Sequence, residues 1–173
     1  MINENLFHAN QRLSEELAQE MALKNRRIVI AESCTAGLVS GILAQVPGIS
    51  KWLCGSSVTY MESVKRQWLG LDAALLTCHT AVSAEVTESM ARAVLERTEA
   101  ADFSVAITGH LEPLQSEVGA VAYVGLAFRD GKEIRVGLVS RFSLPGKDRL
   151  ERQWAAAQSA LRLAVSFLQE VTG

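Results

Sequence analysis

A serine stands in the segment AESCTAG (residues 31–37), after a run of β-branched residues and before a helical pattern. Ser33 could act as a nucleophile, because unpaired N–H groups at a helix start can stabilise the oxyanion that forms when a serine attacks a carbonyl carbon. Alternatively, Ser33 and Thr35 cap the helix, since both residue types are common at that position. The residue types leave both interpretations open.

A serine hydroxyl at its ordinary pKa is a poor nucleophile and needs a general base. No carboxylate spacing marks His8, His79 or His110 as a triad member. A lysine is another known base, and Lys65 falls about one helical turn beyond a strand pattern that ends at Tyr60. To act at neutral pH, the amine must be desolvated or lie beside a cation, so that its pKa falls by roughly 3 units. A solvated surface lysine is the alternative.

Two predicted elements position this serine. Apolar residues at helical spacing predict an amphipathic helix over about residues 4–24, and the run 28–31 predicts a strand buried on both faces of a parallel sheet. A second helix is predicted to begin near Cys34 and to end at Pro47-Gly48. Ligands bind beyond the carboxyl ends of strands in open α/β sheets. Ser33 would lie at such an end.

The rest of the chain alternates helical and strand patterns. Strands are predicted over 55–60, 103–108, 118–128 and 134–143, and helices over 61–68, 83–97 and 150–168. Asp130-Gly131 predicts a hairpin turn, and Ser83 followed by Glu85 predicts a helix start. This order predicts an α/β fold in one domain, residues 1–173: a three-layer α/β/α sandwich with a mixed, mostly parallel sheet.

Composition narrows the possible partners. The 173 residues are 49% apolar and 21% charged, as in globular proteins, and the net charge of -2 with scattered basic residues argues against nucleic acid. We expect neither a signal peptide nor a membrane partner, because no apolar run reaches roughly 20 residues. Cys34, Cys54 and Cys78 form no CxxC pair, which argues against a disulfide framework and a metal site and favours a cytoplasmic location.

Together, these segments resemble the C-terminal domain of the CinA (competence/damage-inducible) family. The matching segments are AESCTAG, Val58-Thr59-Tyr60 with Lys65, AVSAE (81–85), ITG (107–109), VG (118–119) and PGKDR (145–149). The resemblance extends from Ile28 to Leu168. It implies a nicotinamide-nucleotide amidase that hydrolyses the carboxamide of nicotinamide mononucleotide to nicotinate mononucleotide and ammonia, with neither metal nor cofactor.

The resemblance also implies roles for individual residues. By position, Ser33 would be the nucleophile, Lys65 the general base, and Tyr60 part of the hydrogen-bond network between them. Backbone N–H groups after Ser33 are candidate oxyanion donors. The predicted contacts of the nucleotide substrate are Cys34, Thr35, Gly37, Thr108, Gly109 and Arg149. Arg149 would bind the phosphate, or it is a solvated charge. We also expect a homo-oligomer, with a dimer favoured, for which the apolar first helix with Phe7 is the candidate contact.

Two segments depart from the family pattern. The nucleophile turn ends in Ala36-Gly37 instead of Gly-Gly, and we expect the extra methyl to be tolerated at a helix start. Residues 109–117 replace a glycine-rich loop, so side chains and the negative charges of Glu112 and Glu117 come near the expected phosphate. The alternative is therefore a divergent or inactive member that binds a nucleotide or acts on another amide. Cys34 is a candidate for a lowered thiol pKa at a helix N-terminus.

Overall fold

Within the part of the chain that the structure describes, five strands form one mixed sheet in the order β2-β1-β3-β4-β5. The computed structural model describes residues 4–112 and 119–170. The strands are β1 (Ile28–Glu32), β2 (Leu53–Val58), β3 (Phe103–His110), β4 (Ala120–Asp130) and β5 (Glu133–Leu144). β1 is parallel to both β2 and β3, whereas the β3–β4 and β4–β5 pairs are antiparallel.

The predicted α/β fold with a mixed sheet is confirmed, but the prediction of a mostly parallel sheet is wrong. Parallel neighbours need a crossover connection of about a dozen residues or more, usually a helix. The segments 111–119 and 131–132 are too short for such a crossover, so β4 and β5 run antiparallel to their predecessors. The predicted hairpin is confirmed, but its turn is Gly131-Lys132, with Gly131 at a φ of +61°, because Asp130 still pairs with Glu133 in the sheet.

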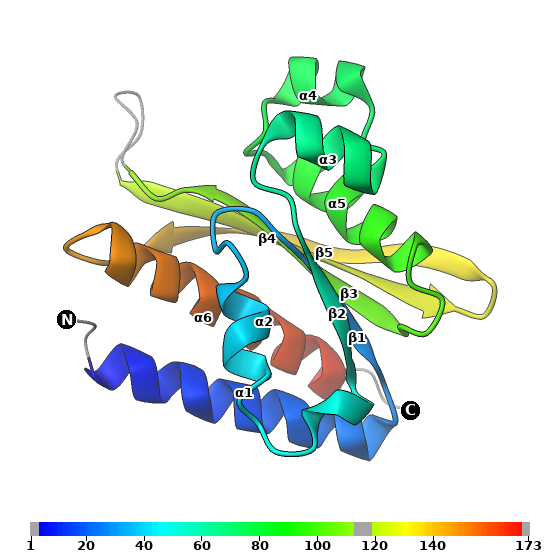
Figure 1. The fold of residues 1–173 in the computed structure, drawn as a ribbon, viewed down its shortest axis with the longest axis vertical. Coiled ribbons are helices and arrows are strands. Elements are labelled where there is room, and N and C mark those ends of the chain that lie inside the picture. Colours follow the sequence, from blue (N-terminus) through cyan, green and yellow to red (C-terminus); the bar gives the residue numbers. More distant parts are fainter. Residues whose placement is uncertain (1–3, 113–118, 171–173) are drawn as a thin grey trace.

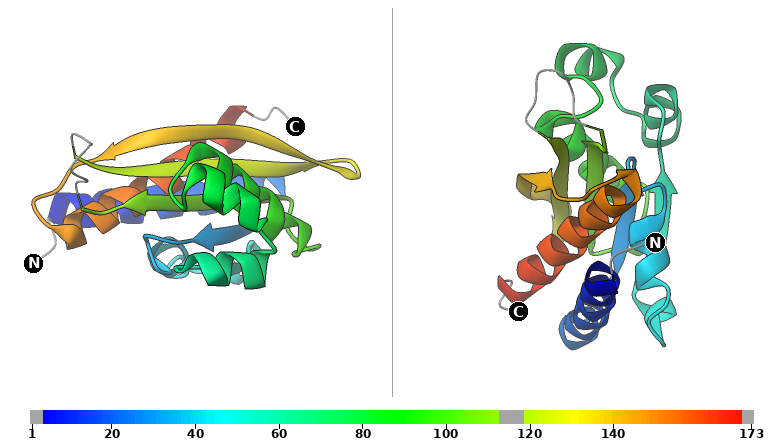
Figure 2. Two further views of the ribbon diagram at one scale, coloured as in Figure 1. Left: turned by 90° about the horizontal axis from the view of Figure 1, so that it is seen from above. Right: turned by 90° about the vertical axis from the view of Figure 1, so that its left-hand side faces the viewer.

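Helices cover both faces of this sheet (Figures 1 and 2). The helical elements are α1 (Glu4–Lys24), α2 (Leu38–Leu43), the 3-10 turn η1 (Ile49–Lys51), α3 (Glu62–Leu69), α4 (Ala73–His79), α5 (Ala84–Glu96) and α6 (Arg149–Glu170). One apolar core lies between the sheet and α1, α2 and α6, and a second lies between the sheet and α3, α4 and α5. None of the described helices is long and apolar enough to cross a membrane.

β1 is buried along its whole length, as its apolar run predicts. Side chains alternate between the faces of a strand, so Ile28 and Ile30 join the first core, and Val29 and Ala31 join the second. Burying each of the larger side chains stabilises the fold by about 1.5–3 kcal/mol. The carboxyl end of β1, which leads into Ser33, is therefore fixed by packing on both faces.

The predicted element boundaries differ from the structure at α2 and at β2. α2 begins at Leu38 instead of near Cys34, because Ala36 and Gly37 have φ values of +52° and +93°, outside the helical region. β2 ends at Val58, and Val118 of the predicted fourth strand lies outside the described residues. The sequence prediction missed α4, whose start is marked by Asp72: its side chain accepts a hydrogen bond from the N–H of Ala74.

The aromatic side chain that we expected at an oligomer contact is used within the chain. Phe7 of α1 packs against Trp154 of α6, with ring centroids 5.6 Å apart. Helices α1 and α6 lie side by side in Figures 1 and 2. Phe7 is thus half-buried at the boundary of the first core, and the homo-oligomer stays a prediction.

Candidate active site

A cavity of about 260 Å³ lies beyond the carboxyl ends of β1 and β3. All the predicted site residues except Thr35 and Gly37 line it: Ser33, Cys34, Tyr60, Lys65, Thr108, Gly109 and Arg149. They come from the turn after β1, from the segment between β2 and α3, from α3 itself, from the end of β3 and from the start of α6. The topology therefore brings together segments that are far apart in the sequence.

Ser33 and Lys65 are in direct contact in this cavity. Lys65 Nζ donates a hydrogen bond to Ser33 Oγ at 2.9 Å. The lysine side chain is only 1% exposed and the serine 7%, so the alternative of a solvated surface lysine is wrong. Lys65 reaches this position because α3 starts directly after β2, whose carboxyl end lies beside that of β1.

The amine of Lys65 is held by backbone oxygens. Lys65 Nζ also donates to the carbonyl oxygen of Thr59 at 2.7 Å and to that of Tyr60 at 3.3 Å. Burial lowers the pKa of Lys65 from 10.5 to about 8, partly offset by Cys34 and Glu62. Because of this desolvation, about one tenth of the amine is neutral at pH 7. Sequence reasoning missed the Thr59 carbonyl, since residue type does not specify where a carbonyl points.

A buried carboxylate shapes the turn that carries Ser33. Glu32 is 0% exposed, and its two oxygens accept hydrogen bonds of 2.7–3.1 Å from three backbone N–H groups and three hydroxyls. These donors are the N–H groups of Gly37, Val39 and Ser40 and the hydroxyls of Thr35, Ser40 and Ser56. Glu32 therefore satisfies the first N–H groups of α2, a role that sequence reasoning missed.

This arrangement excludes the helix-capping interpretation of the serine turn. The N-cap position of α2 is Gly37, and it makes no side-chain hydrogen bond. The hydroxyl of Thr35 donates to Glu32, and that of Ser33 accepts from Lys65. Thr35 and Gly37 thus shape the turn without lining the cavity, so the structure does not place them with the other predicted substrate contacts.

Few backbone N–H groups in the turn remain to stabilise an oxyanion. The N–H of Ser33 donates to the carbonyl of Ile107, and that of Ala36 donates to the carbonyl of Ser33, both at 3.0 Å. The N–H groups of Gly37, Val39 and Ser40 donate to Glu32, and that of Leu38 donates to the carbonyl of Thr35. Of the backbone N–H groups that we predicted as oxyanion donors, those of Cys34 and Thr35 are therefore the remaining candidates. Gln153 of α6 braces this part of the turn by donating to the carbonyl of Thr35 at 3.0 Å.

Tyr60 uses its backbone and its side chain for different contacts. Its carbonyl accepts from Lys65, whereas its phenolic oxygen accepts from Arg149 Nη2 at 2.7 Å. Tyr60 therefore contacts Lys65 through its carbonyl, whereas its phenol takes no part in the Ser33–Lys65 contact. Arg149, at the start of α6, lines the cavity and is 54% exposed. It can bind an anionic group that enters from solvent.

Cys34 is buried, with a raised thiol pKa. Burial is the main cause that raises the pKa of Cys34 to about 12; the negative charge of Glu32 acts in the same direction, whereas a backbone hydrogen bond and the charge of Lys65 oppose it. The prediction of a lowered thiol pKa is wrong because Cys34 precedes the helix start by several residues and lies in a dry environment. Cys34 can still contact a ligand, since it lines the cavity.

Thr108 and Gly109 line the cavity but also serve the fold. The hydroxyl of Thr108 donates to the carbonyl of Ala81 at 2.8 Å, which ties the α4–α5 connection to β3. A Cβ atom at Gly109 would approach the carbonyl oxygen of Val121 to 2.5 Å, so sheet packing alone requires glycine there. His110 lines the same cavity, but Ser33 Oγ has Lys65 as its hydrogen-bond partner.

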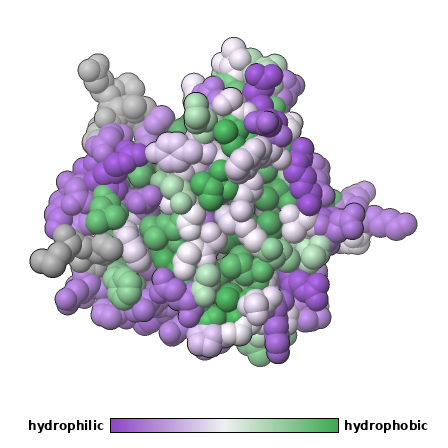
Figure 3. Space-filling model, viewed as in Figure 1, coloured by the Kyte–Doolittle hydropathy of each residue, from purple (hydrophilic) through white to green (hydrophobic). Residues whose placement is uncertain are grey.

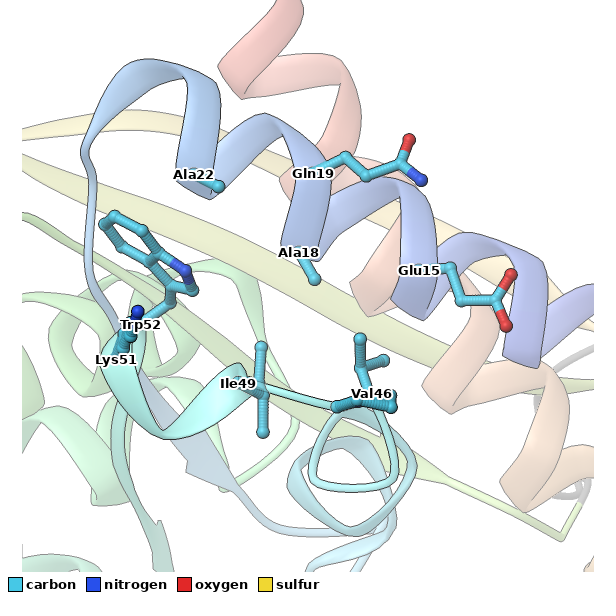
Figure 4. A pocket seen from close by; sticks show the side chains of 10 residues that line it. Glu15, Ala18, Gln19, Ala22, Val46, Ile49, Lys51 and Trp52 are labelled. Atoms are coloured by element: carbon cyan, nitrogen blue, oxygen red, sulfur yellow. The ribbon is translucent and has the colours of Figure 1, made fainter.

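A larger groove of about 510 Å³ lies between α1 and the segment around η1. Figure 4 shows Val46, Ile49 and Trp52 facing Ala18 and Ala22 across it. In Figure 3, hydrophobic residues gather in the middle of this face and hydrophilic residues surround them. The groove is lined by no hydroxyl or thiol nucleophile, so its chemistry differs from that of the Ser33 cavity.

The comparisons with known proteins agree with this fold. The family model described as the CinA C-terminal domain matches residues 10–168. A CinA-like protein from Mycobacterium marinum is 39% identical over 170 residues, which cover 92% of this chain and 39% of that protein. The chain belongs to the CinA C-terminal domain family, and it spans about two fifths of the length of the curated relatives it matches.

Solved structures share the fold over almost their whole length. The competence damage-inducible protein A (ComA) from Klebsiella pneumoniae superposes with a TM-score of 0.83 at 24% identity, covering 94% of this chain and 99% of that one. The competence/damage inducible protein CihA from Agrobacterium tumefaciens gives a TM-score of 0.81 at 27% identity, covering 94% and 96%. The fold therefore occurs in those chains without a further domain.

Proposed function

We propose that this chain is a serine amidohydrolase that hydrolyses the carboxamide of nicotinamide mononucleotide to nicotinate mononucleotide and ammonia. The observation that carries the proposal is the buried hydrogen bond of 2.9 Å between Lys65 Nζ and Ser33 Oγ. A hydroxyl next to a partly neutral amine in a cavity is an activated nucleophile. Membership of the CinA C-terminal domain family supports the choice of substrate.

The reaction begins when neutral Lys65 removes the proton of Ser33. The serine oxygen then forms a bond to the amide carbon, and the N–H groups of Cys34 and Thr35 are the proposed donors to the oxyanion. Lys65 returns the proton to the amide nitrogen, the carbon–nitrogen bond breaks, and ammonia leaves. The nicotinoyl group remains attached to Ser33 as an ester.

Water completes the cycle through the same two residues. Lys65 removes a proton from water, the water oxygen attacks the ester carbon, and the bond to Ser33 breaks as Lys65 returns the proton to the serine oxygen. The nicotinate nucleotide leaves as a carboxylate. Arg149 is the proposed contact for the phosphate, because it is a half-exposed guanidinium in the wall of the same cavity.

Ammonia release from nicotinamide mononucleotide tests this proposal. Wild-type protein is expected to release ammonia, and Ser33→Ala and Lys65→Ala are each expected to lower the rate by at least about a thousandfold. Ser63→Ala, an exposed serine in the same helix as Lys65, is the matched control. A wild-type rate that equals the rates of the Ser33 and Lys65 variants would disprove the amidase proposal.

A second candidate is a divergent member that binds a nucleotide or acts on another amide. The observation that favours it is the carboxylate of Glu112, which lines the cavity close to Arg149. A thermal-shift series with pyridine and adenine nucleotides tests binding without catalysis. A ligand at a hundredfold excess over its dissociation constant stabilises the folded chain by about 2.7 kcal/mol. No shift with any nucleotide would rule out the binding role.

A further inference from the structure

Glu112 lies in the cavity wall between two arginines. Its Oε1 atom is 3.7 Å from Nη1 of Arg149, and its Oε2 atom is 3.2 Å from Nη1 of Arg152. Both Glu112 and Arg149 line the cavity that contains Ser33. A carboxylate of the chain itself therefore faces the guanidinium that the proposed function assigns to the substrate phosphate.

The two arginines are held in different ways. Arg152 is 16% exposed, and it donates to the carbonyl of Leu111 at 3.1 Å and to that of Gly146 at 3.2 Å. These backbone contacts fix Arg152 whether or not the carboxylate is present. Arg149 is 54% exposed, and its Nη2 atom donates to the phenolic oxygen of Tyr60. Moving the carboxylate of Glu112 would leave Arg152 anchored and would open Nη1 of Arg149 to another anion.

We propose that Glu112 is a specificity-determining residue whose carboxylate competes with a ligand phosphate for Arg149. The inference rests on the proposed function, because it assumes that the amide lies at Ser33 and the phosphate faces Arg149. Carboxylate and phosphate bind the same guanidinium donors, and two anions at one site repel each other. Glu112 thus weakens the binding of phosphate-bearing carboxamides and leaves that of phosphate-free ones unaffected.

The exposure of the ion pair sets the size of the effect. The side chain of Glu112 is 60% exposed, so water screens its charge. We expect removal of this charge to tighten the binding of a phosphate-bearing ligand about fivefold, which corresponds to about 1 kcal/mol and to the upper range for exposed charge pairs.

The test measures binding in the absence of turnover. Glu112→Gln is introduced into Ser33→Ala protein, and calorimetry measures the dissociation constants of nicotinamide mononucleotide and of its phosphate-free nucleoside, nicotinamide riboside. The dissociation constant of the mononucleotide is expected to fall about fivefold, whereas that of the riboside stays the same. In protein that also carries Arg149→Ala, the effect of Glu112→Gln on the mononucleotide is expected to be smaller, because the competition for the guanidinium is gone and only the repulsion between the two anions remains.

A matched control separates local from general charge effects. Glu99→Gln removes one negative charge from an exposed position in the turn before β3, whereas the cavity lies beyond the other end of that strand. Glu99→Gln is expected to change neither dissociation constant. An equal change for both ligands, an equal effect of the two substitutions, or no binding of the mononucleotide by either protein would overturn the proposed role of Glu112.

Ammonia release by proteins that retain Ser33 reports separately on the proposed function. If wild-type protein releases no ammonia but Glu112→Gln selectively tightens binding of the mononucleotide, the amidase proposal fails and the role of Glu112 stands. If ammonia is released but the two ligands respond equally to Glu112→Gln, the role of Glu112 fails and the amidase proposal stands.

Discussion

Lys65 Nζ and Ser33 Oγ lie 2.9 Å apart, although 32 positions separate the two residues in the sequence. Each residue follows a strand of the parallel half of the sheet, Ser33 after β1 and Lys65 after β2. Both side chains are buried, so the amine has lost most of its hydration. The chemistry of the pair therefore depends on the proton of one amine.

The amidase rate is expected to rise with pH as Lys65 loses this proton. Burial lowers the pKa of Lys65 to about 8, so the neutral fraction grows from about one tenth at pH 7 to about one half at pH 8. The kcat/KM for ammonia release should therefore increase about fivefold over that interval and level off above pH 9. A rate that does not change with pH would contradict the assignment of Lys65 as the base.

The same pKa predicts a pH dependence of stability. Folding favours the neutral amine, so the penalty of burying Lys65 is fully present below pH 8 and is lost as the pH rises to its ordinary pKa of 10.5. Relative to Lys65→Met, which cannot titrate, the wild type should gain about 2 kcal/mol of unfolding free energy between pH 8 and pH 10. Urea denaturation of both proteins across that range measures the gain. A constant difference between them would show that the amine titrates alike in both states.

Even the isosteric substitution Glu32→Gln is expected to destabilise the folded chain. In Glu32→Gln one carboxylate oxygen becomes an NH2 group that faces other donors, so several buried hydrogen bonds are lost. We expect the free energy of unfolding to fall by about 2–4 kcal/mol. Glu99→Gln, at an exposed position, should change it by less than about 0.5 kcal/mol. Equal denaturation midpoints for the two variants would argue against this role of Glu32.

The left-handed turn before α2 predicts opposite effects at two adjacent residues. Ala36 has a φ of +52°, so Ala36→Gly should stabilise the chain by about 0.5 kcal/mol after allowance for the added freedom of the unfolded chain. Gly37 has a φ of +93°, and Gly37→Ala should destabilise it by about 1–2 kcal/mol. Thermal unfolding of both variants tests the pair, and shifts of the same sign would contradict it.

We expect the Cys34 thiol to react slowly with alkylating reagents in the folded chain. Burial raises the pKa of its thiol to about 12, whereas Cys54 and Cys78 are exposed. Iodoacetamide at pH 8 should therefore modify the two exposed thiols first and Cys34 only after addition of denaturant. Mass spectrometry of the peptides measures the order. Early modification of Cys34 accompanied by loss of activity would restore the earlier prediction of a reactive thiol.

The sequence predicted the parts of the site that depend on local pattern. The apolar run 28–31 identified β1. The pairing of Lys65 with Ser33 was implied by the family resemblance, because the spacing of the residues alone left a solvated lysine open. The start of α2 was missed because alanine is a good helix former, and its positive φ at Ala36 comes from the surrounding contacts. The six hydrogen bonds of Glu32 and the direction of the Tyr60 phenol depend on the folded path of the chain.

The oxygens that anchor Lys65 belong to the main chain of Thr59 and Tyr60. Every amino acid has a backbone carbonyl, so a substitution at either position does not remove the hydrogen-bond acceptor of Lys65. The position of the Lys65 amine is set by the backbone conformation between β2 and α3. An insertion or deletion in this segment would displace the amine. Substitution of Thr59 or Tyr60 therefore leaves the two carbonyls that hold Lys65 in place, whereas substitution of Glu112 or Arg149 changes the side chains that face a ligand.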